Sequence, residues 1–284
     1  MGRVARLFFV LLCCLCLPLT ASAAQKSPFG QKTGEHRLVA GTELIADIVR
    51  DLLPEPIEIL VLVPAAACPG HHDMRAADMA FFSIADIVLV HGWQRKAPGL
   101  AEAAVAAKLG AERMKTVQVY GSFLVPEHQI AASREIARYL AAVPGVDAGA
   151  VDDRLEKRVA RISALAGEKL ALLAQYRGTP VLSAEMQAEF VRWTGMDVKG
   201  EYGRAEDLSP ATLMQLTDTG KKTGVKVVVD NLQSGAEAGL PLARELGAAH
   251  VGFSNFPGYI PEAPDYASLL SLNVQLLLKA LERP

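Results

Sequence analysis

The chain has 284 residues and a nearly balanced charge, with 29 Lys and Arg against 31 Asp and Glu. A hydrophobic content of 51% and only 4 cysteines exclude a disordered chain and a small disulfide-stapled domain. The absence of a basic excess argues against a nucleic-acid-binding protein. The length suits two modest domains, each with a buried core.

The first 23 residues have the pattern of a signal peptide. The apolar run Leu7–Leu17 is shorter than the roughly 20 residues that span a bilayer. Arg3 and Arg6 precede it, and the small-x-small triplet Ala21–Ala23 follows. A buried N-terminal helix is the alternative, and a lipoprotein anchor is disfavoured because no small residue precedes the cysteines of the run. Removal of this segment leaves Cys68 as the single cysteine, so we expect an exported, periplasmic or extracytoplasmic protein without an internal disulfide.

Short apolar runs alternate with helical segments along the first half of the chain. This alternation predicts βα units and a mostly parallel sheet, and Thr42 is placed to cap the first helix. The predicted strands are Arg37–Ala40, Ile57–Leu62, Ile87–His91 and Thr116–Tyr120, and the predicted helices are Glu43–Leu53, Ala76–Phe82, Ala101–Leu109 and Glu127–Ala142.

A long helix is predicted at Ala150–Gln175. Its apolar residues recur every three or four positions, which forms one helical stripe over about 38 Å at 1.5 Å per residue. No strand interrupts it, so it predicts a rigid brace between two halves. The stripe consists of Val151, Leu155, Val159, Ile162, Ala166, Leu170 and Leu173.

The alternation of strands and helices then resumes. The fold class expected is α/β, with two βα lobes of mostly parallel sheets joined by one long linking helix. The expected division is a signal peptide at 1–23, an N-terminal lobe at 24–148, a linking helix at 149–177 and a C-terminal lobe at 178–284. In such folds ligands bind at the carboxyl ends of the strands. The predicted strands are Val181–Ser183, Val225–Val229 and His250–Phe253, and the predicted helices are Met186–Thr194, one starting at Ser209-Pro210, Glu237–Leu246 and Tyr266–Leu281.

The densest polar cluster is CPGHHDMR, Cys68–Arg75, directly after a predicted strand. Imidazole is the commonest transition-metal ligand, so His71 and His72 are candidate ligands; two solvent-exposed loop histidines are the alternative. The glycine-rich phosphate loops, the Gly-x-Ser-x-Gly turn and the His-Glu-x-x-His helix are absent from the sequence.

Order and spacing of several segments resemble the zinc- and manganese-binding receptors of metal ABC transporters, over the whole mature chain. The resemblance implies a monomeric extracytoplasmic receptor that catalyses no reaction, binds a divalent metal between two lobes and delivers it to a membrane permease. The long helix matches the family's linking helix. The segments that carry the resemblance are LVAGTELIADIVRDLL (Leu38–Leu53), the stretch Val61–Gly92 with its loop histidines, PEHQIAASREIARYL (Pro126–Leu140) and VLSAEMQAEFVRWTG (Val181–Gly195).

The resemblance also implies where the metal ligands lie. The first ligand falls at His71 or His72, and the third falls at Glu185, where manganese-type members carry a carboxylate. At the second position the stretch Gly121–Val125 contains no histidine, and His128 lies nearby. A set of His71, His72, His128 and Glu185 favours Zn²⁺ as cargo, with Mn²⁺ possible.

The fourth ligand position of the family normally carries an Asp. Here Ser254 or Asn255 stands in its place, and neither is a strong transition-metal ligand. Two interpretations stay open: the site is rebuilt from the remaining ligands, or the fold has lost tight metal binding.

Several further residues are interpreted from their position alone. Asp230 follows the predicted strand Val225–Val229 at its carboxyl end, where it is placed to orient a ligand histidine. Glu189 lies one helical turn from Glu185, on the same face. His91 is interpreted as a structural histidine, and Trp93 is expected to pack inside its lobe.

Two alternative functions remain. The first is the same fold with a metal chelate, a corrinoid or a haem-like compound as ligand. The second is a secreted zinc hydrolase with a His-His-Glu site and an open water position, although no motif supplies its general base.

Overall fold

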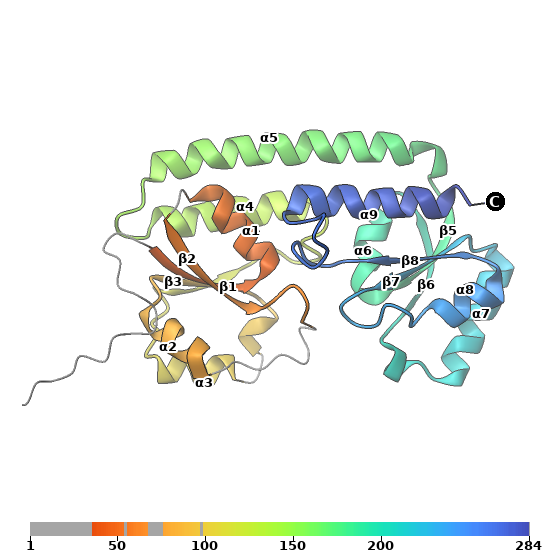
Figure 1. Ribbon diagram of the computed structural model, residues 1–284, viewed down its shortest axis with the longest axis horizontal. Coiled ribbons are helices and arrows are strands. Elements are labelled where there is room, and N and C mark those ends of the chain that lie inside the picture. Colours follow the sequence, from red (N-terminus) through yellow and green to blue (C-terminus); the bar gives the residue numbers. More distant parts are fainter. Residues whose placement is uncertain (1–35, 54–55, 68–75, 97–98, 284) are drawn as a thin grey trace, which may run out of the picture. The chain divides into compact units, whose positions relative to one another are not determined.

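The N-terminal lobe is built on a parallel sheet of four strands in the order β2-β1-β3-β4 (Figure 1). The computed structural model describes residues 36–53, 56–67, 76–96 and 99–283, which fall within one compact unit. All five residues of β3 are buried, as in a strand covered on both faces. The elements of this lobe are β1 (His36–Thr42), α1 (Glu43–Leu52), β2 (Ile57–Val63), α2 (Ala76–Ile84), β3 (Ile87–His91), α3 (Leu100–Ala106), β4 (Met114–Val117) and α4 (Pro126–Ala141).

The C-terminal lobe repeats this plan, with strands in the order β6-β5-β7-β8, all parallel. The central strand β7 is entirely buried, with three valines followed by Asp and Asn at its carboxyl end. The elements are β5 (Pro180–Ala184), α6 (Glu185–Trp193), β6 (Asp197–Tyr202), α7 (Pro210–Thr223), β7 (Val227–Asn231), α8 (Leu240–Leu246), β8 (Ala249–Phe253) and α9 (Tyr266–Leu281).

The linking helix α5 (Ala148–Leu173) has 26 residues and begins at Asp147, whose side chain accepts hydrogen bonds from two backbone N–H groups of the first turn. It packs against α1 and α4 of the N-terminal lobe and against α9 of the C-terminal lobe (Figure 1). Its buried side chains include most of the predicted apolar stripe. The predicted fold class, two parallel α/β lobes joined by a long helix, is thereby confirmed.

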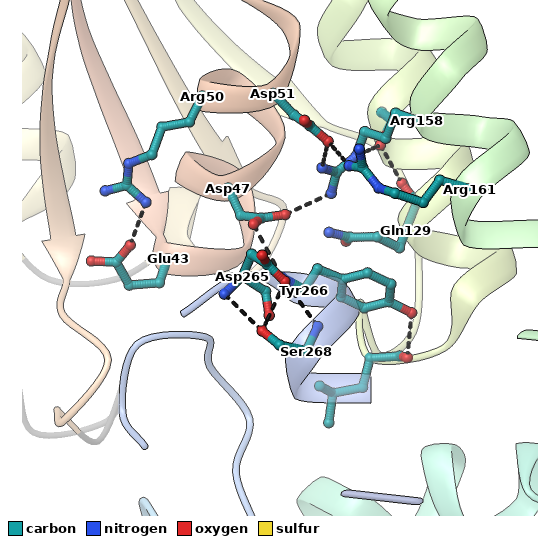
Figure 2. A network of polar contacts seen from close by, with 12 residues as sticks. Glu43, Asp47, Arg50, Asp51, Gln129, Arg158, Arg161, Asp265, Tyr266 and Ser268 are labelled. Atoms are coloured by element: carbon teal, nitrogen blue, oxygen red, sulfur yellow. Dashed lines mark hydrogen bonds and ion pairs between the residues drawn. The ribbon is translucent and has the colours of Figure 1, made fainter. Parts of the chain in front are cut away.

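A buried guanidinium fixes α5 to the N-terminal lobe (Figure 2). Arg158 is 2% exposed and donates to Asp47 at 2.7 Å, to Asp51 at 2.5 Å and to the Ser133 hydroxyl at 3.0 Å. The other carboxylate oxygen of Asp47 accepts the backbone N–H of Tyr266, the first residue of α9, at 3.1 Å. One carboxylate on α1 therefore holds both α5 and α9.

Tyr266 continues this connection toward the loop before α4. Its hydroxyl donates to the carbonyl oxygen of Leu124 at 2.8 Å, and its side chain is 1% exposed. Burial raises the pKa of this phenol well above its usual value.

Within the described residues no helix is long and apolar enough to cross a membrane.

Two expectations about local structure require correction, and one strand was not predicted. The edge strand β6 was not predicted, since its alternating charged residues and Gly200 do not form an apolar run. The strand predicted at Thr116–Tyr120 instead ends at Val117, because the N–H of Gln118 donates to the Glu135 carboxylate at 2.8 Å rather than to a neighbouring strand. Thr42 precedes α1 but makes no side-chain cap, because its hydroxyl bonds His91.

Candidate metal site at the carboxyl ends of the strands

Two of the four predicted ligands can be located. His71 and His72, like Cys68, lie in the segment 68–75, outside the described residues. His128 lies in the first turn of α4, and Glu185 is the first residue of α6. Both helices start directly after a loop or strand that leaves the carboxyl edge of its sheet.

The His128 side chain is 30% exposed, and its Nδ1 lies 3.1 Å from the carbonyl oxygen of Ser122. A carbonyl only accepts hydrogen bonds, so Nδ1 carries the proton in this contact. In the neutral ring the lone pair is then on Nε2. Metal-binding histidines use this arrangement, in which the second ring nitrogen donates to a carbonyl or carboxylate.

The Glu189 carboxylate from α6 reaches the same loop. Its Oε2 accepts the backbone N–H of Ser122, and its Oε1 lies 3.6 Å from His128 Nδ1. The sequence indicated that Glu189 shares a face with Glu185, but not that it contacts the other lobe. Gly121 has a positive φ of 92°, and a Cβ there would lie 2.5 Å from Glu189 Oε1. The positive φ and this close approach together favour glycine at the position.

Glu185 differs from Glu189 in its surroundings. It is exposed, and it forms no hydrogen bond or ion pair with the part of the chain that the structure describes. Its carboxylate is therefore available to a ligand. Across the described ranges, no three His, Cys, Asp or Glu side chains lie close enough together to hold a metal ion.

The expected fourth position is a buried, neutral cluster. Ser254 is 0% and Asn255 7% exposed, directly after β8. Asn255 Oδ1 accepts from Gln187 Nε2 at 2.8 Å, and its Nδ2 donates to Asn231 Oδ1 at 3.0 Å. The Gln187 Oε1 atom is buried without a hydrogen-bond partner among the described atoms. Amide groups therefore surround Asn255 at this position.

Asp230 has a different partner from the one the sequence suggested. Its buried carboxylate accepts from the Tyr202 hydroxyl at 2.8 Å and from the Gly239 N–H at 2.9 Å, and it lies 2.5 Å from His250 Nε2. It orients a histidine, but that histidine belongs to β8 and is none of the predicted ligands. Burial and the Asp230 charge raise the pKa of Tyr202 far above its usual value.

His91 at the end of β3 is a structural residue. Its Nε2 lies 2.8 Å from the Thr42 hydroxyl, and its ring meets that of Phe123 edge-on at 4.4 Å. Burial lowers the pKa of this imidazole from 6.5 to about 3. The expectation for Trp93 is wrong, since its side chain is 49% exposed and stacks on His91.

Solved structures define the class of this fold. The structure titled "Crystal structure of ZnuA" matches with a TM-score of 0.73 and 18% identity over 87% of this chain and 99% of that one. A periplasmic metal-binding protein from Candidatus Liberibacter asiaticus matches with a TM-score of 0.72 and 13% identity over 87% of this chain and 99% of its own. The fold is that of periplasmic metal-binding proteins.

A third solved structure and a family model extend the comparison. The solute-binding protein FpvC from Pseudomonas aeruginosa, solved with Mn²⁺, matches with a TM-score of 0.71 and 20% identity over 87% of this chain and 98% of that one. No curated protein matches the sequence. The family model described as "Zinc-uptake complex component A periplasmic" matches residues 38–280. The chain belongs to this family, and the resemblance found in the sequence is confirmed.

Proposed function

We propose that the protein is an extracytoplasmic solute-binding receptor that captures a divalent transition metal between its lobes and delivers it to an ABC permease. Membership of the zinc-uptake family supports this role. The receptor acts as a monomer and catalyses no reaction. The segment 1–23 serves as its signal peptide, and 24–148, 149–177 and 178–284 are its lobes and linking helix.

The observation that carries the proposal is the orientation of His128. Its Nδ1–H is held by the Ser122 carbonyl, which leaves the Nε2 lone pair for a metal. Glu185 supplies a carboxylate that has no partner among the described residues, and His71 or His72 completes the set from the segment after β2. A site with more imidazoles than carboxylates suits Zn²⁺ better than Mn²⁺.

The test is the metal content of protein exported natively, followed by stripping and retitration with Zn²⁺ and Mn²⁺. We expect about one zinc per chain, and weaker binding in at least two of the variants His71→Ala, His72→Ala, His128→Ala and Glu185→Ala. The matched control is His36→Ala, because His36 is the first residue of β1 and the proposed site lies at the carboxyl ends of the strands. Protein that neither retains nor takes up metal contradicts the proposal.

Delivery requires a second experiment. The metal-loaded protein is added to proteoliposomes that contain a metal-type ABC permease and its ATPase. Stimulated ATP hydrolysis and metal uptake are expected with loaded receptor. Equal stimulation by the metal-free protein would exclude a metal-delivery role.

A metal chelate is the second candidate cargo, favoured by exposed aromatic side chains after two strands. Trp93 follows β3 and is 49% exposed, and Tyr120 follows β4 and is 86% exposed. A planar organic ligand has stacking partners there, whereas a bare ion does not use them. Native mass spectrometry distinguishes the candidates, because a chelate adds organic mass that is lost in Trp93→Ala, while bare-ion binding is unchanged in that variant.

A further inference from the structure

We propose that Glu189 is the positioning residue for His128: a carboxylate on the C-terminal lobe fixes the tautomer and the orientation of an imidazole on the N-terminal lobe. The proposal rests on the proposed metal-binding function. It adds a residue that belongs to none of the predicted ligand positions.

The first argument is that the contacts of Glu189 and His128 meet at Ser122. The backbone N–H of Ser122 donates to Glu189 Oε2, and the carbonyl of Ser122 accepts from His128 Nδ1 at 3.1 Å. Glu189 Oε1 lies 3.6 Å from the same Nδ1. Glu189 Oε2 therefore holds the backbone of Ser122, and Glu189 Oε1, together with the Ser122 carbonyl, favours the Nδ1–H form of the ring.

The second argument concerns which side of the ring the carboxylate occupies. Nδ1 and Nε2 lie on opposite sides of an imidazole, so a carboxylate beside Nδ1 does not bind an ion held by Nε2. Glu189 consequently acts through His128 rather than on the metal. Glu185, one turn earlier on α6, is the carboxylate left without a partner in the described structure.

The third argument is the space that Gly121 leaves. A Cβ at this position would lie 2.5 Å from Glu189 Oε1 and 2.6 Å from His128 Cε1. The φ of Gly121 is 92°, a backbone conformation that residues with a Cβ rarely adopt. The stretch in which the resemblance places a second histidine thus has room for Glu189 from the other lobe instead.

The test uses the full-length mature protein with Glu189→Gln. The new amide oxygen can still accept the Ser122 N–H, but its NH₂ group then faces His128 Nδ1. The charge that favours Nδ1–H is thereby lost and only the Ser122 carbonyl still favours this form, so the Nε2–H form, which blocks the metal-binding lone pair, gains population. We expect ¹⁵N NMR of metal-free protein at mildly alkaline pH to show the Nδ1–H tautomer in wild type and a shift toward Nε2–H in the variant. We also expect zinc affinity to fall about 10- to 100-fold.

Two further variants complete the design. Glu201→Gln removes the same charge from β6 of the same lobe, where Glu201 pairs with the exposed Arg192, and should leave tautomer and affinity unchanged. Gly121→Ala crowds both Glu189 Oε1 and the His128 ring, so it should disturb the contact between them and also shift the tautomer while Glu189 itself is retained.

The outcomes separate this proposal from the proposed function. A His128 tautomer that is the same in wild type and in both Glu189→Gln and Gly121→Ala overturns the positioning role, even if zinc binds. A wild-type protein that binds no metal refutes the receptor function instead, and the tautomer shift then still decides whether Glu189 orients the ring.

Discussion

At the end of β3 the His91 imidazole is enclosed by Thr42 and Phe123, and its pKa is lowered to about 3. An unfolded chain takes up this proton near pH 6.5. Between pH 3 and pH 6.5 the unfolded state binds more protons than the folded state. The stability that depends on burying a neutral imidazole is therefore fully present above pH 6.5 and is lost progressively as the pH falls toward 3.

His91→Asn should therefore change the pH dependence of stability. Relative to this variant, wild type should lose about 1.4 kcal/mol of unfolding free energy per pH unit below pH 6. Urea unfolding at a series of pH values measures the difference. His36→Asn, at the other end of the sheet, serves as the control, and parallel curves for wild type and His91→Asn would exclude a buried neutral imidazole.

Asp230 gives a second prediction at this scale. Its carboxylate accepts from Tyr202, Gly239 and His250, all of which present donors. Asp230→Asn turns an NH₂ group toward one of them, and we expect a loss of about 2–3 kcal/mol in unfolding free energy. Urea denaturation tests this against the exposed Asp218→Asn on α7. A loss no larger than in that control contradicts the interpretation.

At the scale of elements, the packing of α5 depends on one buried polar side chain, Arg158. Arg158 is buried between Asp47 and Asp51, so its removal leaves a buried carboxylate without a counter-charge. Arg158→Ala should cost about 3–5 kcal/mol of unfolding free energy. Lys157→Ala, on the exposed face of the same helix, should change it by less than about 0.5 kcal/mol. Equal effects of both substitutions in urea unfolding would show that α5 is held by its apolar stripe alone.

The spacing of apolar residues predicted most helices and strands, because these elements are determined by local patterns in the sequence. The strand Ile87–His91 and the helix Tyr266–Leu281 were predicted with the observed bounds. The edge strand β6 escaped prediction because only one of its faces packs on the lobe. The contact between Glu189 and Ser122 joins residues 67 positions apart, and no local pattern reports such a contact.

For the molecule as a whole, the ties between the lobes limit their relative motion. Glu189 bonds the N-terminal lobe from α6, and Tyr266 bonds it from α9 through Asp47 and Leu124. We therefore expect metal capture by adjustment of loops rather than by wide hinge closure. Small-angle X-ray scattering of metal-free and loaded protein should give superimposable curves. A clear decrease in the radius of gyration on loading would contradict this expectation.

The hydrogen bond between Asp47 and Tyr266 also has a consequence for how the chain folds. It joins residues 219 positions apart, and contacts of such high sequence separation form late and slowly. Until the last helix is available, α1 lacks one of the two groups that its buried carboxylate binds. In a growing chain, the packing around α1 is therefore complete only once the carboxyl-terminal helix has been synthesised.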